Sequence, residues 1–377
     1  MSGLPPQLFR NPIDLLELLC EELELTDTQK QSAERSYNTV SEWLNDRDSE
    51  IARYRPHIHP QGSIALGTTV KPHNRADFDI DLICLLQVMH DISANDLFHL
   101  VYNRLLTHGT YKKILSRMNR CARLDYEPDY HLDITPAKPH IIGGTHIYVP
   151  DRALAELRDS NPKGYIDWFI GIGHRSPKIS RLIALANPRI ENRASVEPLE
   201  LQQSFEKTPD VAVISVIITT LTAMSYSRFV GSEFATMEDF VETVVRDLPN
   251  GLECRQFRGR VEWWLPNPSS PTENFAEKWN VDSKKKEAFD KWHAHTLATL
   301  DQVLRPEARG LHNFAAANSR LMGENLVNRV IASHGKRMLS LQESGGLSVL
   351  TGTSGLTLGT TSKTSGMPVR SNTYYGA

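Results

Sequence analysis

The chain has few cysteines and little net charge. Its 377 residues contain four cysteines that lie far apart and lack the spacing of a metal site: Cys20, Cys84, Cys121 and Cys254. We therefore expect buried or incidental thiols in a reducing cytosol, and a cytoplasmic protein. The formal net charge of -3 argues against a protein that binds long nucleic acid through its overall electrostatic field.

Long hydrophobic runs are also missing. Pro5, Pro6 and Pro12 interrupt the N-terminal segment, so we expect no signal peptide there. The longest apolar stretch, 211–226, contains five serine and threonine residues and is short for a membrane span. It favours a buried helix and predicts no membrane partner. The chain is long enough for two lobes with substantial cores.

What the chain does contain is a series of alternating acids before a short apolar segment. Asp77, Asp79 and Asp81 lead into residues 82–86, which have the length expected of a strand buried on both faces. Alternate side chains of a strand share a face, so these carboxylates would repel one another unless cations lay between them. Oxygen ligands suit Mg²⁺, which completes its shell with water and substrate phosphates. A calcium loop is the alternative, but that loop requires a glycine where Leu82 stands.

A third carboxylate lies further along the chain. Residues 130–134 alternate between polar and apolar, which predicts that Asp133 lies on a neighbouring strand; taken alone, such an acid is usually a surface residue. Three carboxylates on two strands would hold two metal ions about 3.5 to 4 Å apart, an arrangement that activates an attacking hydroxyl and stabilises a leaving pyrophosphate. Before the acids, Gly62 and Ser63 predict a phosphate-binding turn, because a residue without Cβ lets the backbone approach phosphate. A glycine–serine pair alone is most often an ordinary loop.

Together these residues resemble the polymerase-β-type nucleotidyltransferases. Within that superfamily they are most similar to the bacterial cGAS/DncV-like nucleotidyltransferases, which make cyclic oligonucleotide second messengers in anti-phage (CBASS) defence. The resemblance spans most of residues 20–340. The segments that carry it are Gln61-Gly62-Ser63, Gly67-Thr68, Lys71-Pro72, Asp79-Ile80-Asp81-Leu82, His131-Leu132-Asp133, Ile147–Arg152, Ser160–Tyr165, Asn267-Pro268 and Glu273–Trp279.

The resemblance implies a set of site residues and ligands. Asp79 and Asp81 would hold two Mg²⁺ ions, for which Mn²⁺ can substitute. Asp133 would bind the ion on the nucleophile side and help to deprotonate a ribose hydroxyl, while the glycine–serine pair would hold the donor phosphates. Asp77 is a spare acid, because in the resembling enzymes the second acid of the pair runs straight into the apolar strand. The substrates would be nucleoside triphosphates, with ATP among them.

The resemblance also implies an α+β fold. It consists of a polymerase-β-like core with a mixed sheet and flanking helices, a C-terminal helical lobe, a long N-terminal helix that braces both lobes, and a disordered C-terminal tail. We expect the catalytic core with the N-terminal helix over residues 1–180, the helical lobe over 181–340 and a flexible tail over 341–377. Local patterns predict a helix after Thr26 or Asp27, a helix after Ser93 or Asn95, a strand pair at 123–126 and 130–134, and mainly helix over 153–168 and from 211 onward.

One segment departs from the family pattern. After Pro209 the resembling enzymes continue into a further helix with basic residues, whereas here the chain passes at once to the apolar residues 211–218. Either the protein has lost a helix whose cations would face triphosphate, or the sequence omits a segment that exists. We favour the second explanation, because removing one helix from a bundle would expose the apolar faces of its neighbours.

The C-terminal region is different in composition. From Ser344 to Gly366 it is dominated by glycine, serine and threonine, which predicts a mobile tether. The chain ends in Gly376-Ala377. An ordinary disordered tail is the simplest interpretation. Some members of the resembling family are joined through their C-terminal residue by ubiquitin-like conjugation enzymes, and a tether that ends in a small residue suits Ala377 for such a partner.

The sequence therefore predicts a metal-dependent nucleotidyltransferase that makes a cyclic di- or trinucleotide from nucleoside triphosphates and releases pyrophosphate. Two alternatives remain. One is a template-independent polymerase that adds nucleotides to RNA or to a small acceptor. The other is a catalytically inactive, nucleotide-binding regulator. The aromatic residue that stacks on the nucleobase is not evident from the sequence.

Overall fold

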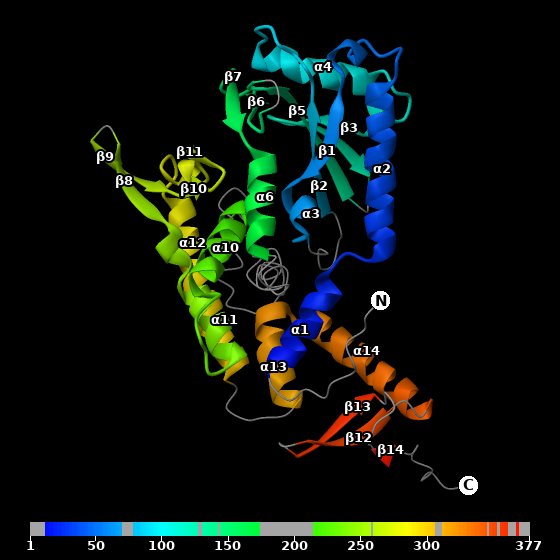
Figure 1. Ribbon diagram of the computed structural model, residues 1–377, viewed down its shortest axis with the longest axis vertical. Coiled ribbons are helices and arrows are strands. Elements are labelled where there is room, and N and C mark those ends of the chain that lie inside the picture. The colour runs from blue at the N-terminus through cyan, green and yellow to red at the C-terminus, as the bar shows by residue number, and fades with distance from the viewer. Residues whose placement is uncertain are drawn as a thin grey trace.

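The computed structural model divides into a sheet lobe and a helical lobe (Figure 1). The sheet lobe contains residues 26–160, and the helical lobe contains the first helix together with the helices from residue 162 onward. The structure describes residues 12–69, 78–126, 130–141, 144–173, 214–257, 259–305, 311–344, 347–352, 355–360 and 367–368. Asp77, Lys71-Pro72, the chain around Pro209 and Ala377 lie outside these ranges.

A mixed sheet forms the centre of the sheet lobe. Five strands follow the order β1-β2-β5-β4-β3, and β6 and β7 continue from the far end of β5. Their bounds are β1 His57–Gln61, β2 Phe78–Leu85, β3 Leu115–Arg117, β4 Ala122–Tyr126, β5 Tyr130–Pro139, β6 Ile147–Asp151 and β7 Glu156–Ser160. The pair β2–β5 is parallel and the other pairs are antiparallel. The mixed sheet and the hairpin β4–β5 confirm the sequence-based expectation.

The two faces of β2 differ, and this difference orients the acids. Phe78, Ile80 and Leu82 are buried, whereas Asp79 and Asp81 between them are partly exposed. Since successive side chains of a strand point to opposite faces, the apolar set packs into the core and the acids share the other face. Helices α2 (Asp27–Asn45) and α4 (Ala94–Leu106) contribute to that core (Figure 1).

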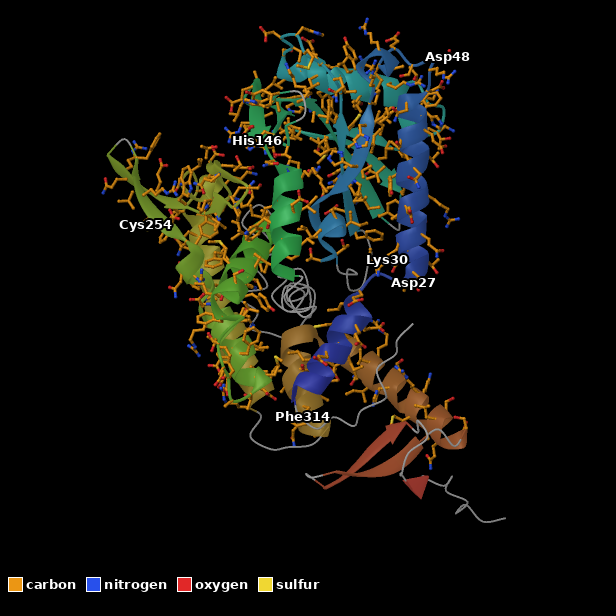
Figure 2. The ribbon with its side chains drawn as sticks, in the orientation of Figure 1. Asp27, Lys30, Asp48, His146, Cys254 and Phe314 are labelled. Atoms are coloured by element: carbon orange, nitrogen blue, oxygen red, sulfur yellow. The ribbon has the colours of Figure 1, made fainter. Side chains whose placement is uncertain are left out.

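Both helices begin at capping residues that the sequence predicts. The Thr26 side chain accepts a hydrogen bond from the Gln29 amide, and the Gln29 side chain accepts one from the Thr26 amide, which completes a capping box. Ser93 caps α4 through the amide of Asp96. Figure 2 shows Asp27 at one end of α2 and Asp48 beyond the other end. Shorter helices of this lobe are α3 Gly62–Leu66, α5 Tyr111–Ile114 and the 3-10 turn η1 Ala52–Tyr54.

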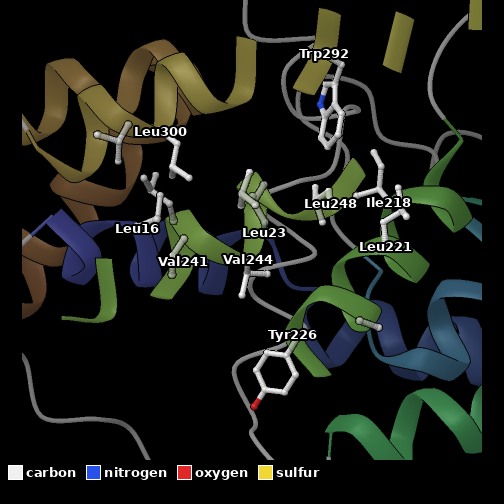
Figure 3. Packing of buried hydrophobic residues seen from close by; sticks show 14 of the residues in the cluster. Leu16, Leu23, Ile218, Leu221, Tyr226, Val241, Val244, Leu248, Trp292 and Leu300 are labelled. Atoms are coloured by element: carbon white, nitrogen blue, oxygen red, sulfur yellow. The ribbon is translucent and has the colours of Figure 1, made fainter. Parts of the chain in front are cut away.

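The helical lobe has its own core, part of which is shown in Figure 3. Its helices are α1 Pro12–Leu23, α6 Pro162–Gly173, α10 Ser215–Phe229, α11 Met237–Arg246, α12 Lys284–Leu304, α13 Leu311–Met322 and α14 Glu324–Glu343, with the 3-10 turns η3 Leu248–Gly251 and η4 Glu277–Trp279. Leu16 of α1, Tyr226 of α10 and Trp292 of α12 all belong to this core. Among the helices that the structure describes, none combines the length and apolar character that a membrane-spanning segment needs.

The helix predicted after Thr26 is present as α2, but its buried residues pack in the sheet lobe rather than in both lobes. Leu16 and Leu19 of α1 pack in the helical lobe, whereas Val40 and Leu44 of α2 pack in the sheet lobe. The chain changes direction at Leu25, because the capping box at Thr26 starts a new helix there. The prediction that this helix braces both lobes is therefore wrong, because the packing in the helical lobe comes from α1, a separate helix that the sequence analysis did not predict. The first helix also belongs to the helical lobe and not to the expected N-terminal core.

The structure corrects the prediction of mainly helical structure over residues 153–168. Residues 156–160 form strand β7, and helix begins only at Pro162. The segment follows β6 after a short turn and pairs with it residue by residue, and this pairing overrides the weak helical pattern. The second lobe likewise contains strands within the region expected to be helical. They form two hairpins, β8–β9 (Glu253–Phe257 and Arg260–Trp264) and β10–β11 (Pro266–Asn267 and Ser270–Asn274).

The C-terminal region also differs from the expected tail without secondary structure. Strands β12 (Leu347–Gly352), β13 (Gly355–Thr360) and β14 (Met367–Pro368) form a small antiparallel sheet. Leucine, valine and threonine make up most of β12 and β13, which gives these segments strand propensity despite their low-complexity composition. Helix α14 extends to Glu343, slightly past the expected start of the tail.

The cysteines fit the expectation from the sequence. All four are free: Cys20 and Cys84 are buried, Cys121 is partly exposed and Cys254 is exposed on β8 (Figure 2). Burial raises the pKa of the Cys84 thiol to about 12, which keeps it protonated and unreactive.

Candidate active site

The parallel pair β2–β5 brings the predicted acids together on one face of the sheet. Asp81 lies directly opposite Asp133, and Asp79 lies opposite His131, two residues earlier on each strand. Because alternate residues of a strand share a face, all three carboxylates stand on the same side of the two strands. Asp79 and Asp81 are partly exposed, while Asp133 is only 9% exposed.

An arginine that the sequence analysis did not single out occupies the same face. Arg123 lies opposite Asp133 in the antiparallel pair β4–β5. Its Nε and Nη2 donate to the two oxygens of Asp133, each at 2.7 Å, and Nη2 lies 3.8 Å from Oδ1 of Asp79. The hydrogen bonds to Asp133 raise the pKa of the Arg123 guanidinium, so this cation remains charged between the acids. Arg123 can be recognised as part of the site only from the register of β4 against β5, which the amino-acid sequence does not reveal.

The acids suit a hard divalent cation by chemical type and by strand placement. Within the described ranges, however, no three histidine, cysteine, aspartate or glutamate side chains form a ready-made metal site. The Asp133 carboxylate is instead held in an ion pair, because both of its oxygens accept hydrogen bonds from the Arg123 guanidinium. A carboxylate triad that includes Asp133 therefore requires Arg123 to move or to share Asp133 with a metal.

Gly62 and Ser63 begin helix α3, which corrects the expectation of a flexible turn. Gly62 has φ +61°, and a Cβ built on it would lie 2.3 Å from Oδ2 of Asp81. Only a glycine fits this backbone beside that carboxylate without displacement. The helix is held at its end by Ser63, whose carbonyl accepts from the Thr68 amide at 2.9 Å and whose hydroxyl accepts from Thr69 Oγ1 at 2.9 Å.

A cavity of about 370 Å³ opens beside these residues, between the two lobes. The sheet lobe contributes Gly62, Ser63, Asp79 and Asp81 to its wall, and the helical lobe contributes Tyr165, Thr219, Asn267, Glu273 and Phe275. This volume lies in the usual range of small-molecule sites. Asp133 is not among the residues that line the cavity, and both of its carboxylate oxygens accept hydrogen bonds from Arg123.

The helical lobe supplies the aromatic surface that the sequence analysis left unassigned. Tyr165 of α6 and Phe275 meet edge to face with ring centroids 5.8 Å apart. The Tyr165 hydroxyl is hydrogen-bonded to Thr220 Oγ1 at 2.8 Å, and burial raises the pKa of this phenol. The ring is thereby fixed in orientation, and Phe78 adds a third aromatic side chain to the cavity wall.

Comparisons with known proteins agree with this architecture. Residues 13–172 match the Second Messenger Oligonucleotide or Dinucleotide Synthetase domain (SMODS). A c-di-GMP synthase from Roseivirga ehrenbergii is 30% identical over 286 residues, which cover 71% of this chain and 72% of the relative.

Solved structures share the fold at lower sequence identity. The CD-NTase CdnG from Bradyrhizobium diazoefficiens, in complex with GTP, superposes with a TM-score of 0.62 at 17% identity, covering 86% of this chain and 99% of that one. The GTP-bound form of Vibrio cholerae DncV superposes with a TM-score of 0.51 at 14% identity, covering 84% and 80%. The matched domain, the curated relative and the shared fold show that the chain belongs to the cGAS/DncV-like nucleotidyltransferases, the enzymes that make cyclic oligonucleotides from nucleoside triphosphates.

Proposed function

We propose that this chain makes a cyclic di- or trinucleotide with GTP among its substrates, in a reaction that depends on Asp79, Asp81 and Asp133. The observation that carries the proposal is the register of β2 and β5, which aligns Asp81 with Asp133 beside a cavity lined by both lobes. The curated relative named c-di-GMP synthase supports GTP as one substrate. ATP remains a second candidate substrate from the family resemblance.

One nucleotidyl transfer for each phosphodiester bond makes the product, two for a cyclic dinucleotide and three for a cyclic trinucleotide. In each, a ribose hydroxyl oxygen attacks the α-phosphorus of a triphosphate, a new P–O bond forms, the bond to the bridging oxygen breaks and pyrophosphate leaves. The first transfer gives a linear dinucleotide. A later transfer, from the remaining triphosphate of the linear product, closes the ring.

Each acid has a distinct role in this proposal. Asp79 and Asp81, exposed at the cavity, would hold Mg²⁺ or Mn²⁺ ions, and Asp133 would join them once Arg123 releases it and would take the proton of the attacking hydroxyl. Bound divalent ions would supply charge neutralisation at the transferring phosphate and the leaving pyrophosphate. Gly62 leaves room for the Asp81 carboxylate, and Ser63 presents polar groups to phosphate.

The setting of the enzyme is part of the same proposal. We infer that it acts in the bacterial cytoplasm, in anti-phage defence, and that neither a membrane nor long nucleic acid is required.

Ala377 is the proposed point of attachment for a ubiquitin-like conjugation enzyme, since a small residue after Gly376 leaves the backbone unhindered. Mass measurement of the C-terminal peptide from cells, with Ala377→Glu as the comparison, tests this attachment.

One observation favours a second candidate function. The bidentate pairing with Arg123 occupies both oxygens of Asp133, and a chain that binds nucleotide without turning it over would not need to release them. Incubation with all four triphosphates and Mg²⁺ or Mn²⁺ distinguishes the candidates. A phosphatase-resistant product formed without an acceptor supports the synthase. Absence of any product supports the regulator, and extension of an added RNA supports the template-independent polymerase.

A further inference from the structure

The wall of the cavity contributed by the helical lobe contains a hydrogen-bonded pair of side chains that the catalytic chemistry does not use. Asn267, which is 3% exposed, donates from Nδ2 to Oε2 of Glu273 at 2.7 Å, and both side chains line the cavity. They belong to the β10–β11 hairpin, on the other side of the cavity from the acids of β2.

The pair is fixed by its surroundings. Oδ1 of Asn267 accepts from the amide and the hydroxyl of Ser269, at 2.9 and 2.8 Å. The same hairpin is tied to the start of α6, because Asn161 Nδ2 donates to the Ser269 carbonyl at 3.0 Å. The single hydroxyl proton of Ser269 is shared between Asn267 Oδ1 and the Asn161 carbonyl, which lies 3.0 Å from the hydroxyl oxygen. The amide of Asn267 therefore cannot rotate without loss of these bonds, and the carboxylate that it holds is preorganised.

The Glu273 carboxylate has unused acceptor capacity. Of the groups that the structure describes, only Asn267 donates to it, and that bond uses Oε2. The side chain is only partly exposed, and this burial raises the pKa of the carboxyl. Arg120 and Arg158 favour its charged form, yet each has its own carboxylate partner, Asp151 for Arg120 and Glu277 for Arg158. A partly buried carboxylate with acceptor capacity toward a cavity favours a ligand that donates hydrogen bonds.

Among the nucleobases, guanine best matches an ionised carboxylate. Its N1–H and its N2 amino group are adjacent donors on one edge, so they pair with the two oxygens of a carboxylate. Adenine and cytosine present a donor beside a ring nitrogen acceptor, which a second carboxylate oxygen would repel. Uracil presents a single donor between two carbonyl oxygens. Tyr165 and Phe275 provide apolar ring surface within the same cavity, against which a base can stack.

We propose that Glu273, held by Asn267, is the residue that selects guanine, by accepting hydrogen bonds from N1–H and N2–H of GTP. This inference rests on the proposed function, because it assigns the base preference of the same cavity. Loss of one member of a good two-bond contact to a base lowers affinity by about tenfold or more. Inosine triphosphate lacks only the 2-amino group and therefore isolates one of the two bonds.

The test measures binding separately from turnover. Dissociation constants for GTP, ITP and ATP are determined by calorimetry with Ca²⁺, which accepts a looser coordination geometry than Mg²⁺. The unmodified protein is expected to bind GTP about tenfold or more tightly than ITP. In Glu273→Gln the amide offers one acceptor and one donor, so it cannot accept from both N1–H and N2–H of guanine. The preference for GTP over ITP should therefore disappear, and the preference for GTP over ATP should fall. Glu287→Gln, an exposed carboxylate on α12, is the matched control and should keep both preferences.

Each outcome decides the inference. Equal affinity of the unmodified protein for GTP and ITP overturns it, and this comparison needs no variant if Glu273→Gln does not fold. Retention of the GTP preference in Glu273→Gln also overturns it. A protein that discriminates GTP from ITP but forms no cyclic product supports the base contact and rejects the proposed synthase. Cyclic product without this discrimination supports the synthase and rejects the role of Glu273.

Discussion

Arg123 and Asp133 face each other across adjacent strands, and the guanidinium donates to both carboxylate oxygens at 2.7 Å. Such two-bond pairs are stronger and more specific in geometry than single contacts. The cation lies on the face where the proposed metal ions would bind, 3.8 Å from Asp79. In the proposed function, metal binding would therefore compete with Arg123 for the Asp133 carboxylate.

Replacing Arg123 should change metal affinity. In Arg123→Met the competing cation is gone, so we expect Mn²⁺ to bind several-fold more tightly than in the unmodified protein, measured by paramagnetic resonance. Without metal the variant should be less stable by about 1 to 3 kcal/mol, because a largely buried carboxylate loses its donors, and Mn²⁺ should restore much of this loss. Arg117→Met on β3, which removes an exposed arginine, is the control. Unchanged Mn²⁺ affinity in Arg123→Met would contradict the competition.

Alanine substitutions at Gly62 and Gly67, which have similar backbone angles, distinguish the cost of backbone strain from the effect of a steric clash with Asp81. Gly62 has φ +61° and Gly67 has φ +68°, so an alanine at either position costs about 1 to 2 kcal/mol of stability. A Cβ at position 62 would also lie 2.3 Å from Asp81 Oδ2, whereas a Cβ at position 67 would meet nothing within 4 Å. Gly62→Ala should therefore displace Asp81 and reduce synthesis by at least about tenfold, a factor equal to 1.4 kcal/mol. Gly67→Ala should lose stability with little change in turnover, and equal turnover of the two variants would argue against the Asp81 assignment.

The paired acids of β2 carry the chemistry in our proposal. Asp79→Ala combined with Asp81→Ala should lower product formation by about 10³-fold or more, since the charge stabilisation of two carboxylates is lost together. The fold should remain, because both side chains are partly exposed rather than part of the core. Asp91→Ala, an exposed acid after the same strand, is the matched control. Radiolabelled nucleotides measure the turnover, and undiminished synthesis by the double variant would reject the assignment.

The sequence predicts the acid-bearing strands because their signal is local. Alternation of Asp79 and Asp81 with buried apolar residues determines which face the acids occupy, whatever the neighbouring strands are. The alignment of Asp81 with Asp133 and of Arg123 with Asp133 depends on strand register, which is fixed by tertiary packing. For this reason the acids were predicted from the sequence and Arg123 was not.

The part of the cavity wall that the helical lobe contributes also depends on tertiary packing and was still harder to predict from the sequence. Asn267 and Glu273 are far in sequence from Asp79, and their role depends on a hairpin that the helical pattern of the region hides. Asn161 holds that hairpin through hydrogen bonds across more than one hundred residues of chain. Contacts of such long range leave no periodic signal in a single sequence. Family segments around these residues were recognisable, but their position in the cavity was not.

The pH dependence of stability should involve His293 on α12. Burial lowers the pKa of this imidazole below its usual 6.5, and Arg246 and Lys286 lower it further, against the opposing effects of a hydrogen bond to the Val245 carbonyl and of Asp290. The unfolded chain therefore takes up a proton at a higher pH than the folded chain does. Stability that is fully present above pH 6.5 should decrease as the pH falls through 6.5 toward the lower pKa of the folded state.

The variant His293→Gln removes this titration. Chemical denaturation from pH 7.5 to 5 should show a smaller loss of stability on acidification in His293→Gln than in the unmodified protein. Some loss should remain, because burial also lowers the pKa of His59, which adds a contribution of the same sign. His295→Gln, on an exposed side chain two residues away, is the control and should keep the slope of the unmodified protein. If His293→Gln retains the full slope, the His293 imidazole does not determine the acid sensitivity, and His59 becomes the next residue to replace.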